Sequence, residues 1–279
     1  MPNILEVENL SKTFPGFALQ SISFALPAGY IMGFIGPNGA GKSTTLKLIL
    51  QLLHQDSGKI RLFDLDPERN QREIKERIGF VFAENYFYED LSVDEMAKIV
   101  ASTYKRWQPK VFSAYVDQFD IPRKNKIKTL SRGTQMKFSL AIALSHEADL
   151  LLLDEPTSGL DPIVRQELIE ILASLREDER KAVLFSTHIT KDLEQIADYI
   201  TFIDQGKLVF SRTKDDILEQ YALVKGEPAL LTAETKGLFC GWDQTRLGFT
   251  GLVSDKIKAG KVLGSQASFE KATLDDIML

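Results

Sequence analysis

Three apolar runs in the chain lack the polar alternation of a half-exposed strand. They cover residues 30–35, 150–153 and 182–187. Such runs are typical of strands in a parallel sheet that is covered on both faces. Residues 43–53 follow the first run and repeat apolar positions at helical spacing. The pattern predicts an α/β fold, with its site at the carboxyl ends of the strands, where ligands bind in such sheets.

Other stretches have different patterns. Residues 1–30 alternate polar and apolar positions, which predicts antiparallel strands beside the site. Residues 84–148 have few strand signals and several helical ones, including a capping box from Ser92 to Glu95, so we expect a helical subdomain there. Residues 199–210 read as a hairpin that ends the main domain at about residue 212.

The pattern of apolar and polar residues changes after the hairpin. A helix signal at residues 213–216 is followed by short apolar pieces separated by glycines. We therefore expect two regions. The first is a main domain over residues 1–212, and the second is a small accessory region over residues 213–279, of mixed structure but mainly strands.

A glycine-rich loop joins the first apolar run to the predicted helix. Its glycines let the backbone curl around phosphates, and a helix N-terminus offers free N–H groups and a positive dipole end. We expect Lys42 to place its charge at the β- and γ-phosphates and Ser43 to ligate Mg²⁺. The predicted ATP-binding loop consists of Gly36, Pro37, Asn38, Gly39, Ala40, Gly41, Lys42, Ser43 and Thr44.

Two acids follow the run of four leucines. We expect Asp154 to hold Mg²⁺, through water, and Glu155 to orient and polarise the attacking water. The next predicted strand ends at His188, which places this histidine at the same sheet edge as Glu155. We expect Glu155 and His188 to share this edge of the sheet with Lys42.

The composition limits the remaining possibilities. The 279 residues are 44% hydrophobic and 26% charged, which is typical of a globular protein, and the net charge of −5 argues against a nucleic-acid partner. No apolar stretch approaches membrane-spanning length, and the N-terminus lacks a secretory signal pattern. We expect a cytoplasmic location. A single cysteine and three histidines leave no zinc-type site, so the expected metal is the Mg²⁺ that arrives with ATP.

Residues 130–134, Leu-Ser-Arg-Gly-Thr, precede the acid pair, and Asp161 follows it in a turn before Pro162. With the phosphate loop and His188, in this order, the chain resembles the nucleotide-binding subunits of ATP-binding-cassette (ABC) transporters. The resemblance covers roughly residues 4–212. It implies a P-loop NTPase core with a parallel sheet, an antiparallel β subdomain and a helical signature subdomain, plus the small C-terminal appendage.

The resemblance also implies that Lys42, Glu155 and His188 are the catalytic residues of an active Mg²⁺-dependent ATPase, and it implies roles in nucleotide binding. Phe14 would stack on the adenine, with Phe17 as the other candidate. Ser131 and Gly133 would bind the γ-phosphate held by an opposite cassette, and Asp161 would belong to the same composite site. Two cassettes, either two copies or two different chains, would then close head to tail around two ATP molecules.

Two departures from the family pattern stand out. The family usually has glutamine after the strand at residues 78–82, where this chain has Ala83 and then Glu84. Either Glu84 replaces that glutamine as a metal ligand, which we favour, or this corner of the site is weakened. In the signature, Arg132 and Thr134 replace commoner residues, but the Ser131 hydroxyl and the Gly133 backbone are retained.

The leading interpretation is an ATP-hydrolysing motor subunit that drives separate transmembrane permease subunits from the inner face of the membrane. The pattern is more similar to bacterial exporters than to importers. In the family, a groove beside the helical subdomain receives a short helix of the membrane subunit. Tyr86, Phe87 and Tyr88 would either line that groove or pack inside the subdomain.

Two alternatives remain. One is a soluble cassette ATPase that acts on ribosomes or DNA, which the single cassette, the absence of a heptad insertion and the acidic charge disfavour. The other is a regulatory cassette with weak hydrolysis, which the Ala83 departure keeps open. The sequence names no cargo.

Overall fold

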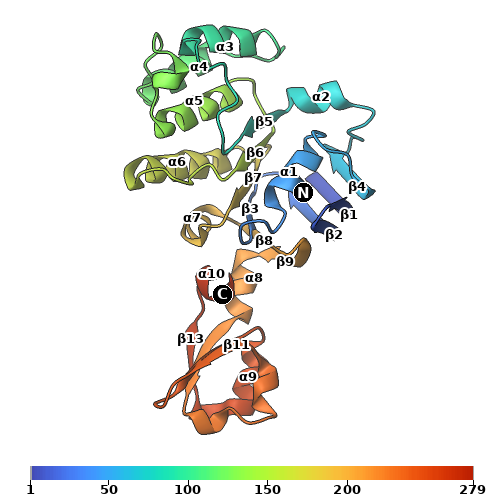
Figure 1. The fold of residues 1–279 in the computed structure, drawn as a ribbon, viewed down its shortest axis with the longest axis vertical. Coiled ribbons are helices and arrows are strands. Elements are labelled where there is room, and N and C mark those ends of the chain that lie inside the picture. Colours follow the sequence, from blue (N-terminus) through green and yellow to red (C-terminus); the bar gives the residue numbers. More distant parts are fainter. Residues whose placement is uncertain (1, 279) are drawn as a thin grey trace. The chain divides into compact units, whose positions relative to one another are not determined.

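The computed structural model describes residues 2–278. By its internal contacts the chain divides into two units, one up to Ser211 and the other from Arg212 (Figure 1). Each unit has its own hydrophobic core.

A six-stranded sheet forms the centre of the N-terminal unit. Its order is β5-β6-β7-β3-β8-β9, and the pairs from β5 to β8 are parallel. All residues of β3, β6 and β7 are buried, as their apolar runs predict, and the polar residues at the carboxyl ends of β6 and β7 are buried with them. The strands are β3 (Ile31–Ile35), β5 (Ile78–Val81), β6 (Leu150–Asp154), β7 (Ala182–Thr187), β8 (Tyr199–Asp204) and β9 (Lys207–Thr213).

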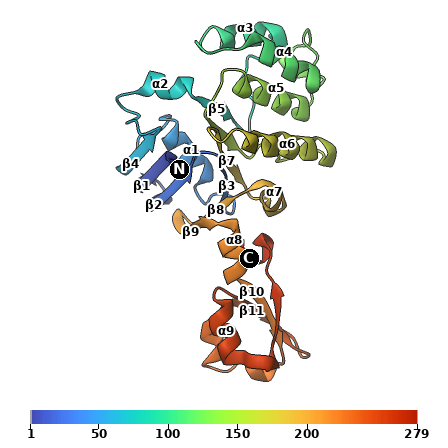
Figure 2. The same cartoon turned by 180° about the vertical axis from the view of Figure 1, so that it is seen from behind.

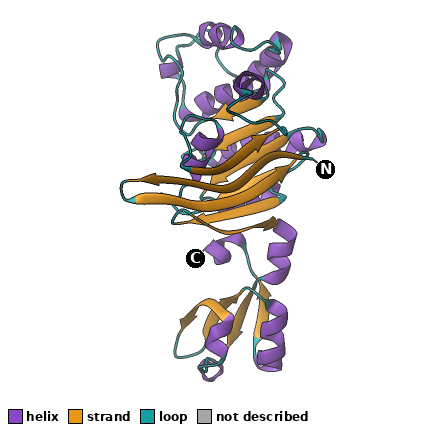
Figure 3. Ribbon diagram, turned by 90° about the vertical axis from the view of Figure 1, so that its right-hand side faces the viewer, coloured by secondary structure: helices purple, strands orange, loops and turns teal. Residues whose placement is uncertain are grey.

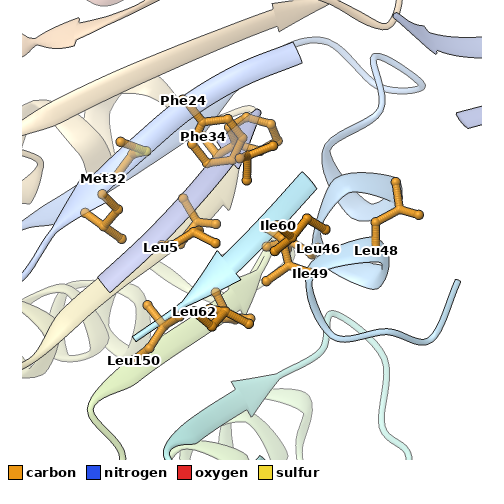
Figure 4. Close-up of a cluster of buried hydrophobic side chains, with 14 of the residues drawn as sticks. Leu5, Phe24, Met32, Phe34, Leu46, Leu48, Ile49, Ile60, Leu62 and Leu150 are labelled. Atoms are coloured by element: carbon orange, nitrogen blue, oxygen red, sulfur yellow. The ribbon is translucent and has the colours of Figure 1, made fainter. Parts of the chain in front are cut away.

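A second, antiparallel sheet has the order β2-β1-β4. The sequence predicts β1 (Asn3–Phe14) and β2 (Phe17–Pro27), whereas β4 (Ser57–Leu62) was not expected. Figure 4 shows the core that this sheet, the central sheet and α1 (Lys42–Ile49) enclose. Its buried side chains come from all three, which holds the phosphate-loop helix against both sheets.

The helix after the phosphate loop is shorter than predicted. It ends at Ile49, and the expectation that it continues to Leu53 is wrong. Gln51 takes a φ of +57°, a left-handed conformation that cannot continue a right-handed helix. The next helix is α2 (Gln71–Glu76).

Residues 84–148 form the helical subdomain, drawn without strands in Figure 3. Its helices are α3 (Val93–Ala101), α4 (Pro109–Gln118) and α5 (Arg132–Leu144). Ser92 and Glu95 form the predicted capping box at the start of α3. Phe138 of α5 is fully buried and packs against Phe87 and Phe112, so α4, α5 and the segment before α3 share one small core.

Two further helices complete the N-terminal unit, α6 (Pro162–Ser174) and α7 (Thr190–Ile196). Helices α5 and α6 lie side by side (Figures 1 and 2), and an ion pair of 2.5 Å between Lys137 and Glu167 joins them. Within residues 2–278, no helix has both the length and the apolar character needed to cross a bilayer.

The C-terminal unit contains a four-stranded antiparallel sheet of order β11-β12-β10-β13. Helices are interleaved with its strands, so the expectation of a region built mainly of strands is wrong. Helix α9 forms despite Gly260, because Ala259 and Leu263 bury its inner face. The elements are α8 (Lys214–Gln220), β10 (Ala222–Gly226), β11 (Phe239–Gln244), β12 (Phe249–Val253), α9 (Lys256–Leu263), β13 (Ser268–Lys271) and α10 (Leu274–Met278).

Short 3-10 helices lie between these elements in both units. They are η1 (Ile127–Thr129), η2 (Leu175–Glu177), η3 (Pro228–Leu230), η4 (Thr235–Leu238) and η5 (Gly264–Gln266).

Candidate active site

The phosphate loop runs from the end of β3 to the start of α1. A Cβ at Gly36 would lie 2.2 Å from the carbonyl oxygen of Ile203, so only glycine fits there. Gly41 has a φ of +113° and precedes α1, whose N-terminus has no side-chain cap within the described chain. The first N–H groups of α1 are therefore free to bind an anion.

Lys42 is buried at the first position of α1. Its Nζ donates to the carbonyl oxygens of Gly36 at 2.7 Å and Pro37 at 3.2 Å. The same ammonium lies 3.3 Å from Oε1 of Glu155. The loop carbonyls and the carboxylate thus hold a positive charge at the centre of the loop.

Asp154 is buried at the carboxyl end of β6. Its Oδ1 accepts hydrogen bonds from the Ser43 hydroxyl at 3.1 Å and from the Ser186 hydroxyl at 2.6 Å. Sequence reasoning paired Ser43 with Asp154 but missed Ser186. The available signal was the two polar residues, Ser186 and Thr187, that end β7 at the same sheet edge.

Glu155 begins the turn after β6 with a φ of +49°. Its backbone N–H donates to the carbonyl oxygen of Ser186 at 3.0 Å. Its Oε2 lies 2.8 Å from Nδ1 of His188, which is 40% exposed. Glu155 therefore bridges Lys42 and His188, and the structure brings together the three side chains expected to be catalytic.

These groups fit Mg·ATP. Uncapped helix N–H groups and a buried ammonium suit phosphate oxygens, and the hydroxyl of Ser43 beside the carboxylate of Asp154 suits Mg²⁺, which prefers oxygen ligands. Within the part of the chain that the structure describes, no three His, Cys, Asp or Glu side chains are grouped as a metal site. Mg²⁺ bound here would use these two side chains together with phosphate oxygens and water.

Residues 130–134, the signature, lie at the start of α5. Ser131 is its N-cap, and the serine Oγ accepts the Thr134 N–H at 3.1 Å and lies 2.9 Å from the Thr134 hydroxyl oxygen. A Cβ at Gly133 would lie 3.1 Å from the Val164 side chain of α6, so the signature packs against α6. No hydrogen bond among the described residues joins Ser131 or Gly133 to the phosphate loop of the same chain.

Asp161 is the N-cap of α6. Its Oδ1 accepts the backbone N–H groups of Ile163 and Val164, each at 3.1 Å. In this structure Asp161 therefore stabilises the start of α6 and makes no contact with the phosphate loop that the described residues record.

Phe14 and Phe17 flank the turn between β1 and β2. Their rings are stacked with centroids 6.4 Å apart. Phe17 is the inner of the two, since its ring tip would lie 3.0 Å from a Cβ at Gly41. The Lys12 ammonium lies over the Phe14 ring, 5.8 Å from the ring centroid.

Ala83 and Glu84 follow β5. Glu84 is exposed, and within residues 2–278 no hydrogen bond or ion pair joins it to Ser43 or Asp154. The structure thus does not bring this predicted metal ligand to the other two.

A groove of about 510 Å³ lies beside the helical subdomain. Of the aromatic trio, Phe87 packs inside the subdomain, whereas Tyr86 and Tyr88 are 63% and 68% exposed and do not line the groove. Tyr86 is close to it only through Phe82, at a ring distance of 4.4 Å. The groove is lined by Leu50, Leu52, Gln71, Arg72, Lys75, Glu76, Ile78, Phe80, Phe82, Thr103 and Tyr104.

A parallel sheet with a glycine-rich phosphate loop, a buried aspartate followed by a glutamate, and a histidine bonded to that glutamate defines a P-loop ATPase. The model of the ABC transporter family matches residues 19–158. The chain belongs to the ATP-binding subunits of ABC transporters, and it is an ATPase.

Two relatives and one solved structure illustrate the similarity. The lantibiotic transport ATP-binding protein SrtF of Streptococcus pyogenes is 34% identical over 220 residues, which cover 76% of this chain and 92% of SrtF. The bacitracin transport ATP-binding protein BcrA of Bacillus licheniformis is 33% identical over 214 residues, 75% of this chain and 69% of BcrA. A solved ATP-binding subunit of an ABC transporter superposes with a TM-score of 0.69 at 26% identity, covering 77% of this chain and 92% of that one.

Proposed function

We propose that this chain is the motor subunit of a transporter that binds Mg·ATP between two cassettes. Lys42 and the N–H groups of α1 hold the phosphates, Ser43 and Asp154 hold the metal, and Phe14 stacks on the adenine. Glu155 orients the attacking water, and His188 keeps Glu155 in place. The observation that carries the proposal is the chain of contacts from Lys42 through Glu155 to His188.

The second cassette supplies Ser131, Gly133 and Asp161 to the site. In support, the signature and the start of α6 lie together in one chain, but among the described residues they make no hydrogen bond to its own phosphate loop. The Ser131 side chain accepts only the Thr134 N–H, and the remaining N–H groups at the start of α5 suit a phosphate brought by another chain.

Membrane permease subunits bind in the groove beside the helical subdomain. Its apolar residues Leu52, Phe80 and Phe82 suit the buried face of a short amphipathic helix, and Arg72 and Lys75 offer charged contacts at its rim. Leu52 is 55% exposed, as expected for a contact residue in the unbound chain. This location would place the chain at the cytoplasmic face of the membrane.

Export is the direction we propose. The support is that SrtF and BcrA, both more than 30% identical to this chain, are named for transport of lantibiotic and bacitracin. The cargo of this chain's transporter would contact the permease subunits.

The test is steady-state Mg·ATP hydrolysis as a function of protein concentration, with Glu155→Gln as the control. We expect hydrolysis to rise faster than linearly with concentration and to fall at least about 100-fold in the variant, because the attacking water loses its base. Full activity in Glu155→Gln would overturn the assignment of Glu155.

Tight ATP binding with negligible hydrolysis would instead require a different partner cassette or the permease. Repeating the assay in the assembled transporter, with and without Ala83→Gln, separates a missing partner from a site weakened at Ala83. A weakly hydrolysing regulatory cassette predicts that only the Ala83→Gln variant gains activity.

A further inference from the structure

Three segments of the N-terminal unit meet at one buried carboxylate, Asp192, in the first turn of α7. Its Oδ2 accepts the Thr157 hydroxyl at 2.7 Å. Its Oδ1 accepts Nε of Arg165 at 2.7 Å and Nη2 of the same side chain at 2.6 Å. The Asp192 side chain is only 2% exposed, and Thr157 is 1% exposed.

The places of these residues along the chain connect them to the site. Thr157 lies two residues after Glu155, in the turn that begins there, and Asp192 lies four residues after His188, in the first turn of α7. The Thr157–Asp192 hydrogen bond therefore ties together the two segments whose side chains meet at 2.8 Å. Arg165 lies one turn after Asp161 and anchors the start of α6 to the same carboxylate.

We propose that Asp192 is a positioning residue for hydrolysis. Through Thr157 and Arg165 it fixes the turn of Glu155 relative to the loop of His188. The inference rests on the proposed roles of Glu155 and His188 but adds residues that the phosphate-loop and acid-pair motifs do not contain.

Two physical arguments support the assignment. A carboxylate taken out of water needs good partners for both oxygens, and Asp192 has them, so its position is closely determined. Glu155 itself is held in a left-handed conformation, which persists only when the surrounding structure imposes it. Thr157, two residues further along the same turn, is held from outside the turn by Asp192.

The experiment compares Thr157→Val with Thr157→Ser. Valine has the shape of threonine but lacks the hydroxyl, and the Arg165–Asp192 ion pair stays intact, so the variant should fold. We expect Thr157→Val to lower kcat about tenfold, because a shift of the reacting groups by less than 1 Å suffices for this. The Kd for Mg·ATP should stay within about twofold, and Thr157→Ser should restore kcat. Asp192→Asn should lower kcat further.

Asp149→Asn is the matched control. Asp149 lies just before β6, at its opposite end, and forms a 2.6 Å ion pair with Arg77. Its loss should lower stability and leave kcat unchanged. Wild-type kcat in Thr157→Val would overturn the proposal, as would equal losses in Thr157→Val and Thr157→Ser, or a fall in kcat in Asp149→Asn as large as in Asp192→Asn.

Glu155→Gln distinguishes this proposal from the one on which it rests. If Glu155→Gln abolishes hydrolysis while Thr157→Val does not change it, Glu155 is catalytic and the positioning role of Asp192 is wrong. If Glu155→Gln is fully active, the assignment of Glu155 itself is wrong. Both assays use the purified chain, or the assembled transporter where hydrolysis requires it.

Discussion

Acidic residues lie at both ends of β6, but the two groups have different partners and different roles. At the carboxyl end, Asp154 and Glu155 contact two serine hydroxyls, a lysine and a histidine. At the amino end, Asp149 pairs with Arg77 and lies 3.8 Å from Arg106, and Arg106 also pairs with Glu147. The strand between them is one apolar run.

The difference lies in the partners. Arginine stays charged at any relevant pH and satisfies a carboxylate in a fixed planar geometry, so the amino end is a structural cluster. Hydroxyl, ammonium and imidazole groups can exchange one partner for another, which a site needs when a phosphate or a water enters. Parallel topology decides which acids meet such groups, because the phosphate loop follows the carboxyl end of β3, the second strand along from β6 in the same sheet.

The largest effect should come from Lys42→Ala at the carboxyl end. The phosphates would lose their central charge, and the carbonyls of Gly36 and Pro37 would lose their donor. We expect hydrolysis to fall about 100-fold or more and ATP binding to weaken, with little change in melting temperature. Isothermal titration and thermal unfolding would measure this. A large drop in melting temperature would show that this end, too, is mainly structural.

His146 gives the amino end a pH dependence. Its ring is fully buried, stacks on Tyr104 and faces the carbonyl oxygen of Ile78. Burial lowers the pKa of His146, against the opposing effect of the nearby carbonyls. The unfolded chain takes up the proton first, near its ordinary value of about 6.5, so stability is full above that pH and is lost as pH falls toward the lowered pKa.

One proton limits the slope to about 1.4 kcal/mol per pH unit. Urea unfolding at several pH values between 5 and 8 would measure it. The variant His146→Gln should flatten the profile in this window, and parallel profiles for both proteins would contradict the assignment.

Asp149→Asn should lower the free energy of unfolding by about 1 kcal/mol, since the pair with Arg77 is partly exposed. Hydrolysis should be unchanged. Chemical denaturation and steady-state turnover of the same preparation would check both statements, and slower turnover at unchanged stability would reverse the contrast between the two ends of β6.

The smallest effect concerns Glu84, at the carboxyl end of the neighbouring strand β5. If it replaces the missing glutamine once nucleotide is bound, Glu84→Ala should lower Mg²⁺-dependent hydrolysis about threefold, the worth of one hydrogen bond. The matched variant Glu89→Ala, in the same exposed segment, should change nothing. Equal rates for both variants and the wild type would confine the site to β3, β6 and β7.

Much of this molecule follows from local sequence. The parallel sheet, the phosphate loop and the acid pair are predictable because each depends on residues close together in the chain. The meeting of Glu155 with His188 is also predictable, since two parallel strands end at one edge.

What the sequence did not reveal depends on tertiary contacts. Ser186 looks like part of a strand, and Asp192 looks like an ordinary acid at a helix start, until the fold brings Arg165 and Thr157 to it. The end of α1 is set by the left-handed conformation of Gln51, which the residue type does not predict. Glycines in residues 237–264 suggested breaks, yet packing against the sheet forms α9.

Gly206, in the turn between β8 and β9, links the phosphate loop to the hairpin of β1 and β2. Its N–H donates to the carbonyl oxygen of Ala40 in the phosphate loop at 3.0 Å, and its carbonyl accepts the N–H of Gln20 at 2.7 Å. One residue thus fixes the hairpin that carries Phe14 relative to the phosphate loop, with no room for a side chain against Ala18. With the base stacked on Phe14, as proposed, Gly206 would determine the distance between the base site and the phosphate loop, so a substitution at Gly206 should change nucleotide selectivity before it changes the hydrolysis rate.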